Sequence, residues 1–306
     1  MRYTYFSFFL FLILIVPVYE TCIADEMSIK AGKIFELCYQ FKFNSADSLM
    51  NSYFNSMKSG EELELNLLQS HILWWKIISG LNDKITIQDY YKTLKKAEFY
   101  FQKEKDKGYA YLYRGIRIYS YMARMDGMNK NYLKALFRLN SCVKFLEKSF
   151  GSETKYPFFY LSSGLYNYHI VAAQKEHPII TPYLWLYPQG NETKGIEQLK
   201  IASESQNKFL SSEGQYFLIK IFLDQKRYNE AMNYSAALQQ KYPNNAVFMY
   251  YQFLILLKLN IINEAIIKSE KLMKNLKSNK EINLIQIKHF EQLIDHDLKA
   301  YHLKTK

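Results

Sequence analysis

The chain has little of what β-structure needs. Its 306 residues include only 11 glycines and 6 prolines, and no stretch sustains the alternation of apolar and polar residues that marks strands. Nearly half of the residues are hydrophobic, at 49%, so a large core is available. Few turn-forming residues with many apolar ones favour long helices, and the sequence predicts an all-α fold.

Thirteen helices are expected from apolar periodicity and from residues that cap helix starts. Capping-box patterns occur at Ser59–Glu62 and Ser212–Gln215, with a weaker one at Thr86–Asp89, and Asn131, Asn191 and Asn244 are single-cap candidates. The predicted helices span 28–39, 44–57, 61–80, 87–104, 107–125, 131–149, 157–174, 192–205, 213–225, 228–241, 245–259, 262–276 and 281–302.

Cysteine and arginine are also scarce, with three and six residues. Cys38 and Cys142 lie on separate predicted helices, and either a disulfide or two buried thiols fits the pattern. The net charge of +11 comes mostly from lysine, and Asn, Ile and Tyr are abundant as well. The codons of an AT-rich genome produce this composition without any selection for an anionic partner. Nucleic-acid binding favours a focused, arginine-containing stripe, so we expect no nucleic-acid partner.

The N-terminus has the form of a secretory signal peptide. Arg2 supplies positive charge, residues 6–16 are almost continuously apolar, and Cys22 and Ala24 are small residues before a possible cleavage point. We therefore expect residues 1–24 to be removed and the chain to be exported to the periplasm or cell envelope. The apolar run is shorter than the roughly 20 residues of a membrane span, so no stable anchor is expected after cleavage, although a retained N-terminus is the alternative.

An internal repeat of 34 residues lies in the C-terminal third. Asn229-Glu230-Ala231 recurs as Asn263-Glu264-Ala265, and the same offset aligns Tyr216 with Tyr250, Leu223 with Leu257, Ser235 with Ser269 and Leu238 with Leu272. A repeat of this length is typical of a helix-turn-helix unit that buries its apolar face only by stacking on a neighbour.

The repeat resembles the tetratricopeptide repeat family. Counted from Ser212, the family's leucine, aromatic, alanine and closing proline positions hold Leu218, Phe222, Ala231 and Pro243. The next unit keeps the alanine as Ala265 and places Leu256 at the aromatic position, but it has Gln252 for the leucine and Lys277 for the proline. Segments 164–168 and 188–195 are similar to a feature of exported bacterial members.

The resemblance implies a right-handed superhelical stack of antiparallel helix pairs, an α-solenoid. The predicted organisation is a signal peptide at 1–24, degenerate helical repeats at 25–150, an aromatic and proline-containing connection at 151–191, repeats at 192–279 and a C-terminal capping helix at 280–306.

In this family the first helix of each unit lines a concave face. Carried over, that assignment makes Tyr216, Lys220 and Tyr250 candidate partner-binding residues, while nearby leucines are also explained by packing. Three arginines close together on one predicted helix, Arg114, Arg117 and Arg124, form a second candidate group for a carboxylate or phosphate, unless acidic neighbours pair with them.

Patterns for chemistry are weak. The histidines and aspartates near residue 296 lack the spacing of a helical metal site, and Cys142 with His169 or His177 has no nucleophile signature. We expect no metal, no cofactor and no enzymatic activity. The sequence favours a scaffold that binds an envelope protein or peptide; the alternative is a glycan or small-ligand module in which Trp185 and the tyrosines of segment 178–188 stack on sugars.

Overall fold

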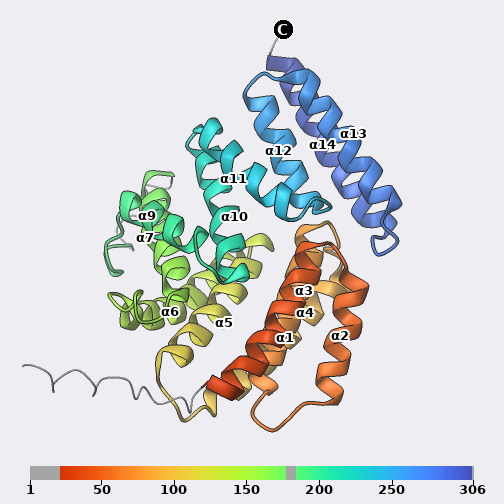
Figure 1. The fold of residues 1–306 in the computed structure, drawn as a ribbon. Helices are drawn as coiled ribbons and strands as arrows, with labels where there is room; N and C mark the ends of the chain where they lie inside the picture. The colour runs from red at the N-terminus through yellow and green to blue at the C-terminus, as the bar shows by residue number, and fades with distance from the viewer. Residues whose placement is uncertain (1–20, 177–183, 305–306) are drawn as a thin grey trace, which may run out of the picture.

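The computed structural model describes residues 21–176 and 184–304, and across those residues thirteen helices follow one another with no strand (Figure 1). The helices are α1 (Thr21–Tyr39), α2 (Phe43–Asn55), α3 (Glu62–Ile78), α4 (Lys84–Gln102), α5 (Tyr109–Met128), α6 (Tyr132–Ser149), α7 (Phe158–Glu176), α9 (Glu192–Ser203), α10 (Lys208–Asp224), α11 (Tyr228–Lys241), α12 (Ala246–Lys258), α13 (Ile262–Ser278) and α14 (Leu284–Lys304). The predicted all-α class is confirmed. The predicted signal peptide lies outside the described residues except for 21–24, which belong to α1.

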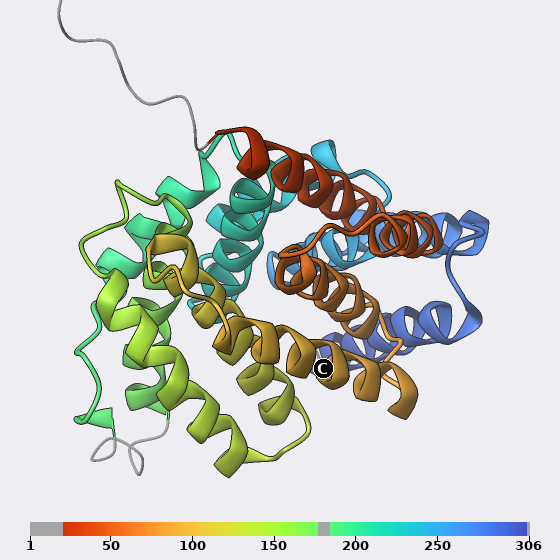
Figure 2. The same ribbon diagram turned by 90° about the horizontal axis from the view of Figure 1, so that it is seen from below.

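Neighbouring helices pack in pairs, as the sequence predicted. The pairs are α1 with α2, α3 with α4, α5 with α6, α7 with α9, α10 with α11 and α12 with α13, and α14 packs on the last of them. First helices also touch one another, since α1 contacts α3 and α10, and α10 contacts α7 and α12. Seen from below, the helices are arranged around the centre of the molecule (Figure 2).

Four of these pairs share one turn. The second residue after the first helix has a positive φ of about 60°, and the N–H of the residue that follows it donates to the carbonyl five residues earlier, which closes the helix end. The positive-φ residues are Phe41 (59°), Lys130 (60°), Lys226 (58°) and Asn260 (61°). The closing bonds run from Lys42 to Leu37, Asn131 to Asp126, Arg227 to Phe222 and Ile261 to Leu256, at 2.9, 2.8, 2.7 and 3.0 Å.

An alanine follows each of these turns at the same distance. Ala46, Ala231 and Ala265 are fully buried, while Ala135 is half-buried. A small side chain lets the second helix approach the first closely. The two alanines of the 34-residue repeat therefore occupy equivalent places. The same turn also joins α1 to α2 and α5 to α6, two pairs that are not 34 residues apart and that the repeat therefore did not reveal.

The glycines of the 164–195 segment mark a close helix crossing. A Cβ on Gly195 would lie 2.8 Å from the Gly164 carbonyl oxygen, and one on Gly164 would lie 3.0 Å from the Gly195 carbonyl oxygen. Beside them Asn167 Nδ2 donates to Gln198 Oε1 over 2.8 Å. This motif holds α7 against α9.

Several predicted helix starts are wrong in detail. The helix predicted from residue 213 begins at Lys208, because the Asn207 side chain accepts from the Leu210 N–H. The cap of α4 is Asp83 and not Thr86. The cap of α12 is Asn245 and not Asn244. The Asn191 cap is confirmed by its bond from Lys194 N–H, whereas the Asn131 side chain makes no cap bond. Ser59–Glu62 makes no hydroxyl cap either, and Glu62 accepts instead from the Gly60 N–H.

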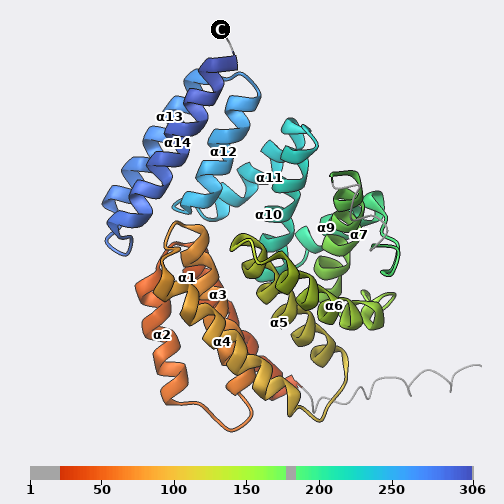
Figure 3. The same cartoon turned by 180° about the vertical axis from the view of Figure 1, so that it is seen from behind.

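The N-terminal helices lie beside the C-terminal ones (Figures 1 and 3). Asn245 Nδ2 donates to the Tyr39 carbonyl over 2.9 Å, and Gln286 Nε2 donates to Ser79 Oγ over 2.6 Å; both bonds are buried. Near the surface, Ser45 Oγ donates to Glu281 Oε1 over 2.6 Å. These contacts join segments more than 200 residues apart.

In the part of the chain that the structure describes, no helix combines the length and the hydropathy needed to cross a membrane. The apolar run at residues 6–16 lies outside that part.

Candidate functional site

Two of the three predicted arginines on α5 are held by acids. Arg114 Nε donates to Glu64 Oε1 over 2.7 Å, Arg117 Nη1 lies 3.4 Å from Glu64 Oε2, and Arg114 also pairs with Glu104. Burial would raise the pKa of Glu64, but Arg117 and Arg114 outweigh burial and hold the pKa below its ordinary value. Arg114 and Arg117 therefore join α5 to α3 through Glu64, and this is the pairing with acidic neighbours that the sequence left open.

Arg124 is different. Its guanidinium carbon lies 3.4 Å from the centre of the Trp74 ring and 4.8 Å from that of Tyr121. Its Nε is buried and has no hydrogen-bond partner among the described residues, and none of them forms an ion pair with it. Arg124 therefore has hydrogen-bonding capacity left, and its plane is fixed by stacking on an aromatic ring.

Lys220 on α10 lies within electrostatic range of Arg124. The surrounding protein lowers the pKa of Lys220, and the positive charge of Arg124 lowers it further, against the opposite effects of Asp224 and Glu213. The ammonium lies 5.6 Å from the centre of the Tyr216 ring and the side chain remains exposed to solvent. The arginine group and the groove group, predicted separately, thus meet at one place, which we call the inner cation site: Arg124, Lys220, Trp74, Tyr121 and Tyr216.

A buried carboxyl lies beside the inner cation site. Glu213 Oε1 accepts from the Tyr39 hydroxyl over 2.8 Å. Burial raises the pKa of Glu213, although Tyr39, Arg124, Lys220 and Arg117 act to lower it. Sequence reasoning missed Glu213 because it placed the residue at a helix start, and it missed Trp74 although Trp74-Trp75 is the only tryptophan pair in the chain.

The two predicted tyrosines differ in accessibility. Tyr216 is only 7% exposed, and its ring packs against Trp75, Phe248 and Tyr251 with centroid distances of 6.1, 6.2 and 5.8 Å. Tyr250 is half-buried, and its hydroxyl donates to Asp297 Oδ2 on α14 over 2.5 Å. Tyr216 forms part of the floor of the site and Tyr250 holds the last helix, so a direct contact of either with a partner stays a prediction.

The other residues considered for chemistry do not converge. Cys142 is a free, buried thiol whose pKa burial raises to about 12, and Cys38 is likewise free, buried and raised in pKa. His177 lies outside the described residues. No group of three or more potential metal ligands occurs in residues 21–176 and 184–304.

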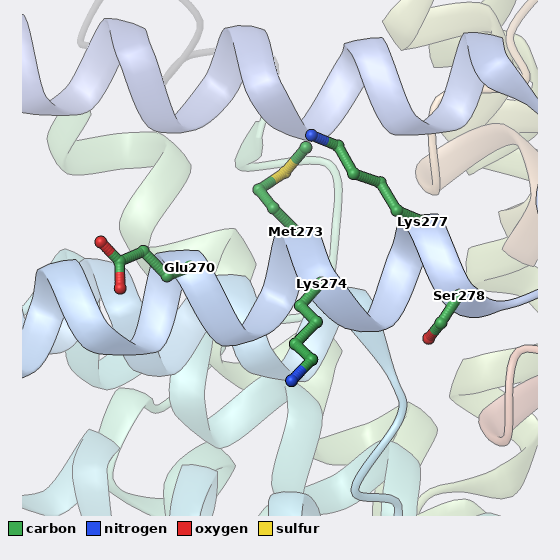
Figure 4. A pocket seen from close by; sticks show the side chains of 5 residues that line it. All are labelled: Glu270, Met273, Lys274, Lys277 and Ser278. Carbon is green, nitrogen blue, oxygen red and sulfur yellow. The ribbon is translucent and has the colours of Figure 1, made fainter.

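The surface hollows are open and shallow. One lies along α13, where the side chains of Met273 and Lys277 extend to one side and those of Glu270 and Lys274 point away from them (Figure 4). A second lies between α2, α3 and α4, with Phe54, Phe99 and Lys96 among its walls. Neither gathers polar groups on one point as a small-ligand site does.

The inner cation site can hold an anionic group of a larger partner. Two cations on different helices interact electrostatically, one stacked on Trp74 and both near tyrosine rings, an arrangement suited to a carboxylate or phosphate. Comparison of the chain with protein-family models, curated proteins and solved structures found no match.

Proposed function

We propose that this chain is a non-enzymatic, exported scaffold of the tetratricopeptide-like, right-handed superhelical type, which binds a protein or peptide of the cell envelope through its inner face. The observation that carries the proposal is that the Arg124 guanidinium stacks on Trp74 with its buried Nε lacking a hydrogen-bond partner among the described residues, while its charge acts on Lys220 of a helix far away in sequence. Export rests on the signal-peptide pattern of residues 1–24.

The partner presents a carboxylate. Burial is the main cause of the lowered pKa of Lys220, and repulsion by the like charge of Arg124 lowers it further. An anion placed between the two cations relieves that repulsion, and Arg124 offers the planar donor geometry that suits a carboxylate. An acidic side chain or chain terminus in an extended segment fits this requirement, while the partly exposed ring of Tyr121 supplies apolar contact.

The test is in vivo cross-linking of the full chain followed by affinity recovery and mass spectrometry. Arg124→Gln should reduce recovery of the bound partner about tenfold, since a charge-assisted hydrogen bond contributes roughly 1.5–3 kcal/mol. Arg227→Gln is the matched control, because Arg227 pairs with Glu230 through two bonds of 2.5 and 2.6 Å on the outer helix α11.

Recovery that is equal for Arg124→Gln, Lys220→Gln and the control would contradict an inner-face binding site. Circular dichroism of each variant should match that of the wild type, which separates loss of binding from loss of fold. Saturable thermal stabilisation by oligosaccharides, with no protein recovered, would instead favour the carbohydrate-binding alternative.

A further inference from the structure

The outward face of α6 is apolar where a solvent-facing helix is normally polar. Leu133 and Phe137 are 75% and 70% exposed, and Leu136 is 41% exposed. Leu133, Phe137, Asn140 and Lys144 recur at helical spacing, so they form one stripe opposite the buried Cys142 and Leu146. Figures 1 and 2 show α6 at the periphery of the molecule, away from the central helices.

A second segment extends this stripe. Trp185 and Leu186 are 76% and 84% exposed, and the hydroxyl of the following Tyr187 contacts Asn140 Oδ1 on α6. Asn140 is one turn from Phe137 on the same stripe. Two elements distant in sequence thus present large apolar side chains to solvent on one side of the molecule, which we call the α6 patch: Leu133, Leu136, Phe137, Trp185 and Leu186.

Positive charge surrounds the α6 patch. α6 carries Lys134, Arg138, Lys144 and Lys148 against the single acid Glu147, and Lys130 precedes it. Arg138 lies 3.5 Å from Glu98, whereas Lys130, Lys134, Lys144 and Lys148 are exposed. The apolar stripe therefore has a rim of flexible cationic side chains.

The corresponding outer helix α11 shows that such a face is not a general feature of this fold. Among the described residues, α6 carries five large exposed hydrophobic side chains, α13 two and α11 none, although all three are second helices joined to their partners by the same turn. The apolar surface of α6 is thus a local property, and isolated exposed residues elsewhere need no such account.

We propose that the α6 patch binds the surface of an anionic lipid bilayer, with Phe137 and Trp185 entering the interface and the lysine rim pairing with acidic headgroups. Exposed tryptophan and leucine with surrounding lysine is the composition that favours the boundary between headgroups and acyl chains. Protein interfaces, in contrast, are depleted in lysine. The patch lies on an outer helix, so association through it leaves the inner cation site open.

Tryptophan fluorescence tests this directly. Of the three tryptophans, Trp74 and Trp75 are buried and Trp185 is exposed, so a change in emission on adding vesicles reports Trp185. The full chain is titrated with vesicles of phosphatidylcholine alone and of phosphatidylcholine mixed with phosphatidylglycerol. Residues 1–24 contain no tryptophan, so contact of that segment with lipid does not produce the signal.

We expect a blue shift with the anionic vesicles, weakened by added salt and absent with phosphatidylcholine alone. Phe137→Glu should need about tenfold more lipid for the same shift. The substitution removes the aromatic ring that enters the bilayer interface and adds a negative charge that the anionic headgroups repel. Ile267→Glu is the matched control, since Ile267 is a similarly exposed apolar residue on α13 and its substitution should leave the titration unchanged. Trp185→Phe should abolish the shift.

Three results would overturn the proposal. The first is emission that does not move with anionic vesicles, and the second is an equal shift with phosphatidylcholine alone. The third is a shift that appears without lipid as protein concentration rises and is lost in Phe137→Glu, which would assign the patch to a second copy of this chain.

Discussion

At the scale of single residues, the interior of this protein is unusually rich in polar and aromatic groups. His71, Glu213 and Arg117 are each less than a tenth exposed. The rings of Phe35, Tyr39 and Trp75 pack around His71, Glu213 accepts from the Tyr39 hydroxyl, and Arg117 lies 5.7 Å from the centre of the Tyr113 ring. Charges and rings that are buried together interact more strongly than they would in water, because the surrounding dielectric constant is low. Substitutions there affect stability before they affect binding.

Tyr216 illustrates this. Tyr216→Ala should lower the free energy of unfolding by about 3–5 kcal/mol, since it removes a buried ring from contact with Trp75 and Phe248. Tyr216→Phe keeps the ring and should cost only about 1 kcal/mol. Urea unfolding followed by circular dichroism measures both; similar small losses for the two variants would show that the ring is not a core element.

His71 makes stability depend on pH. Burial, with Arg117 and Arg124, lowers the pKa of His71 well below its ordinary 6.5, so the unfolded chain takes up a proton that the folded chain does not. Stability from this group is complete above about pH 6.5 and falls at lower pH, by up to about 1.4 kcal/mol per unit. The lowered pKa of His289 acts in the same direction, and the raised pKa of Glu213 acts in the opposite one.

The His71→Leu variant isolates this contribution. Its unfolding free energy should fall less steeply than that of the wild type between pH 6.5 and 5.5, as measured by urea unfolding at each pH. Equal slopes for the two proteins would mean that His71 takes up its proton in the folded chain as it does in the unfolded one, so that its pKa is not lowered by folding.

At the scale of the elements, the turn with a positive-φ residue is the repeated feature. A side chain with a Cβ costs about 1–2 kcal/mol in this conformation, yet the four positions hold Phe, Lys, Lys and Asn in place of glycine. The turn is therefore maintained by the close packing of the two helices it joins, with alanine at the crossing.

Lys226→Gly should raise the free energy of unfolding by about 0.5 kcal/mol, because relief of the strained φ exceeds the extra entropy of the unfolded chain. Lys271→Gly, in the exposed interior of α13, should instead lower it by about 1 kcal/mol. Thermal unfolding distinguishes the two, and a loss at both positions would argue against the left-handed conformation at Lys226.

At the scale of the whole molecule, contacts between the N-terminal and C-terminal helices decide the arrangement. Asn245 takes part in two ways: its Oδ1 accepts from the Phe248 N–H as a helix cap, and its Nδ2 donates to the Tyr39 carbonyl. Asn207 caps α10 in the same manner, through Leu210 N–H, and makes no second side-chain bond to α1. The two asparagines thus form a matched pair.

Asn207→Ala should lower the free energy of unfolding by about 1 kcal/mol, the usual effect of losing a cap. Asn245→Ala should lower it by about 1–3 kcal/mol more, since it also leaves a buried carbonyl without its donor. Denaturant unfolding of both variants measures the difference. If the two losses are equal, the contact between α1 and α12 contributes nothing to stability.

Local sequence determined the helices, their pairing and two of the four alanine-marked turns, because apolar periodicity, few glycines and a 34-residue repeat are features of neighbouring residues. The same reasoning identified Arg124 and Lys220 but as members of two separate groups. Tertiary structure alone decided that they meet, that Arg114 and Arg117 are paired with Glu64, and that Tyr216 is buried. The physical reason is that contacts such as Asn245 with Tyr39 join residues far apart in the chain, and they follow from how whole helices pack, which no local pattern encodes.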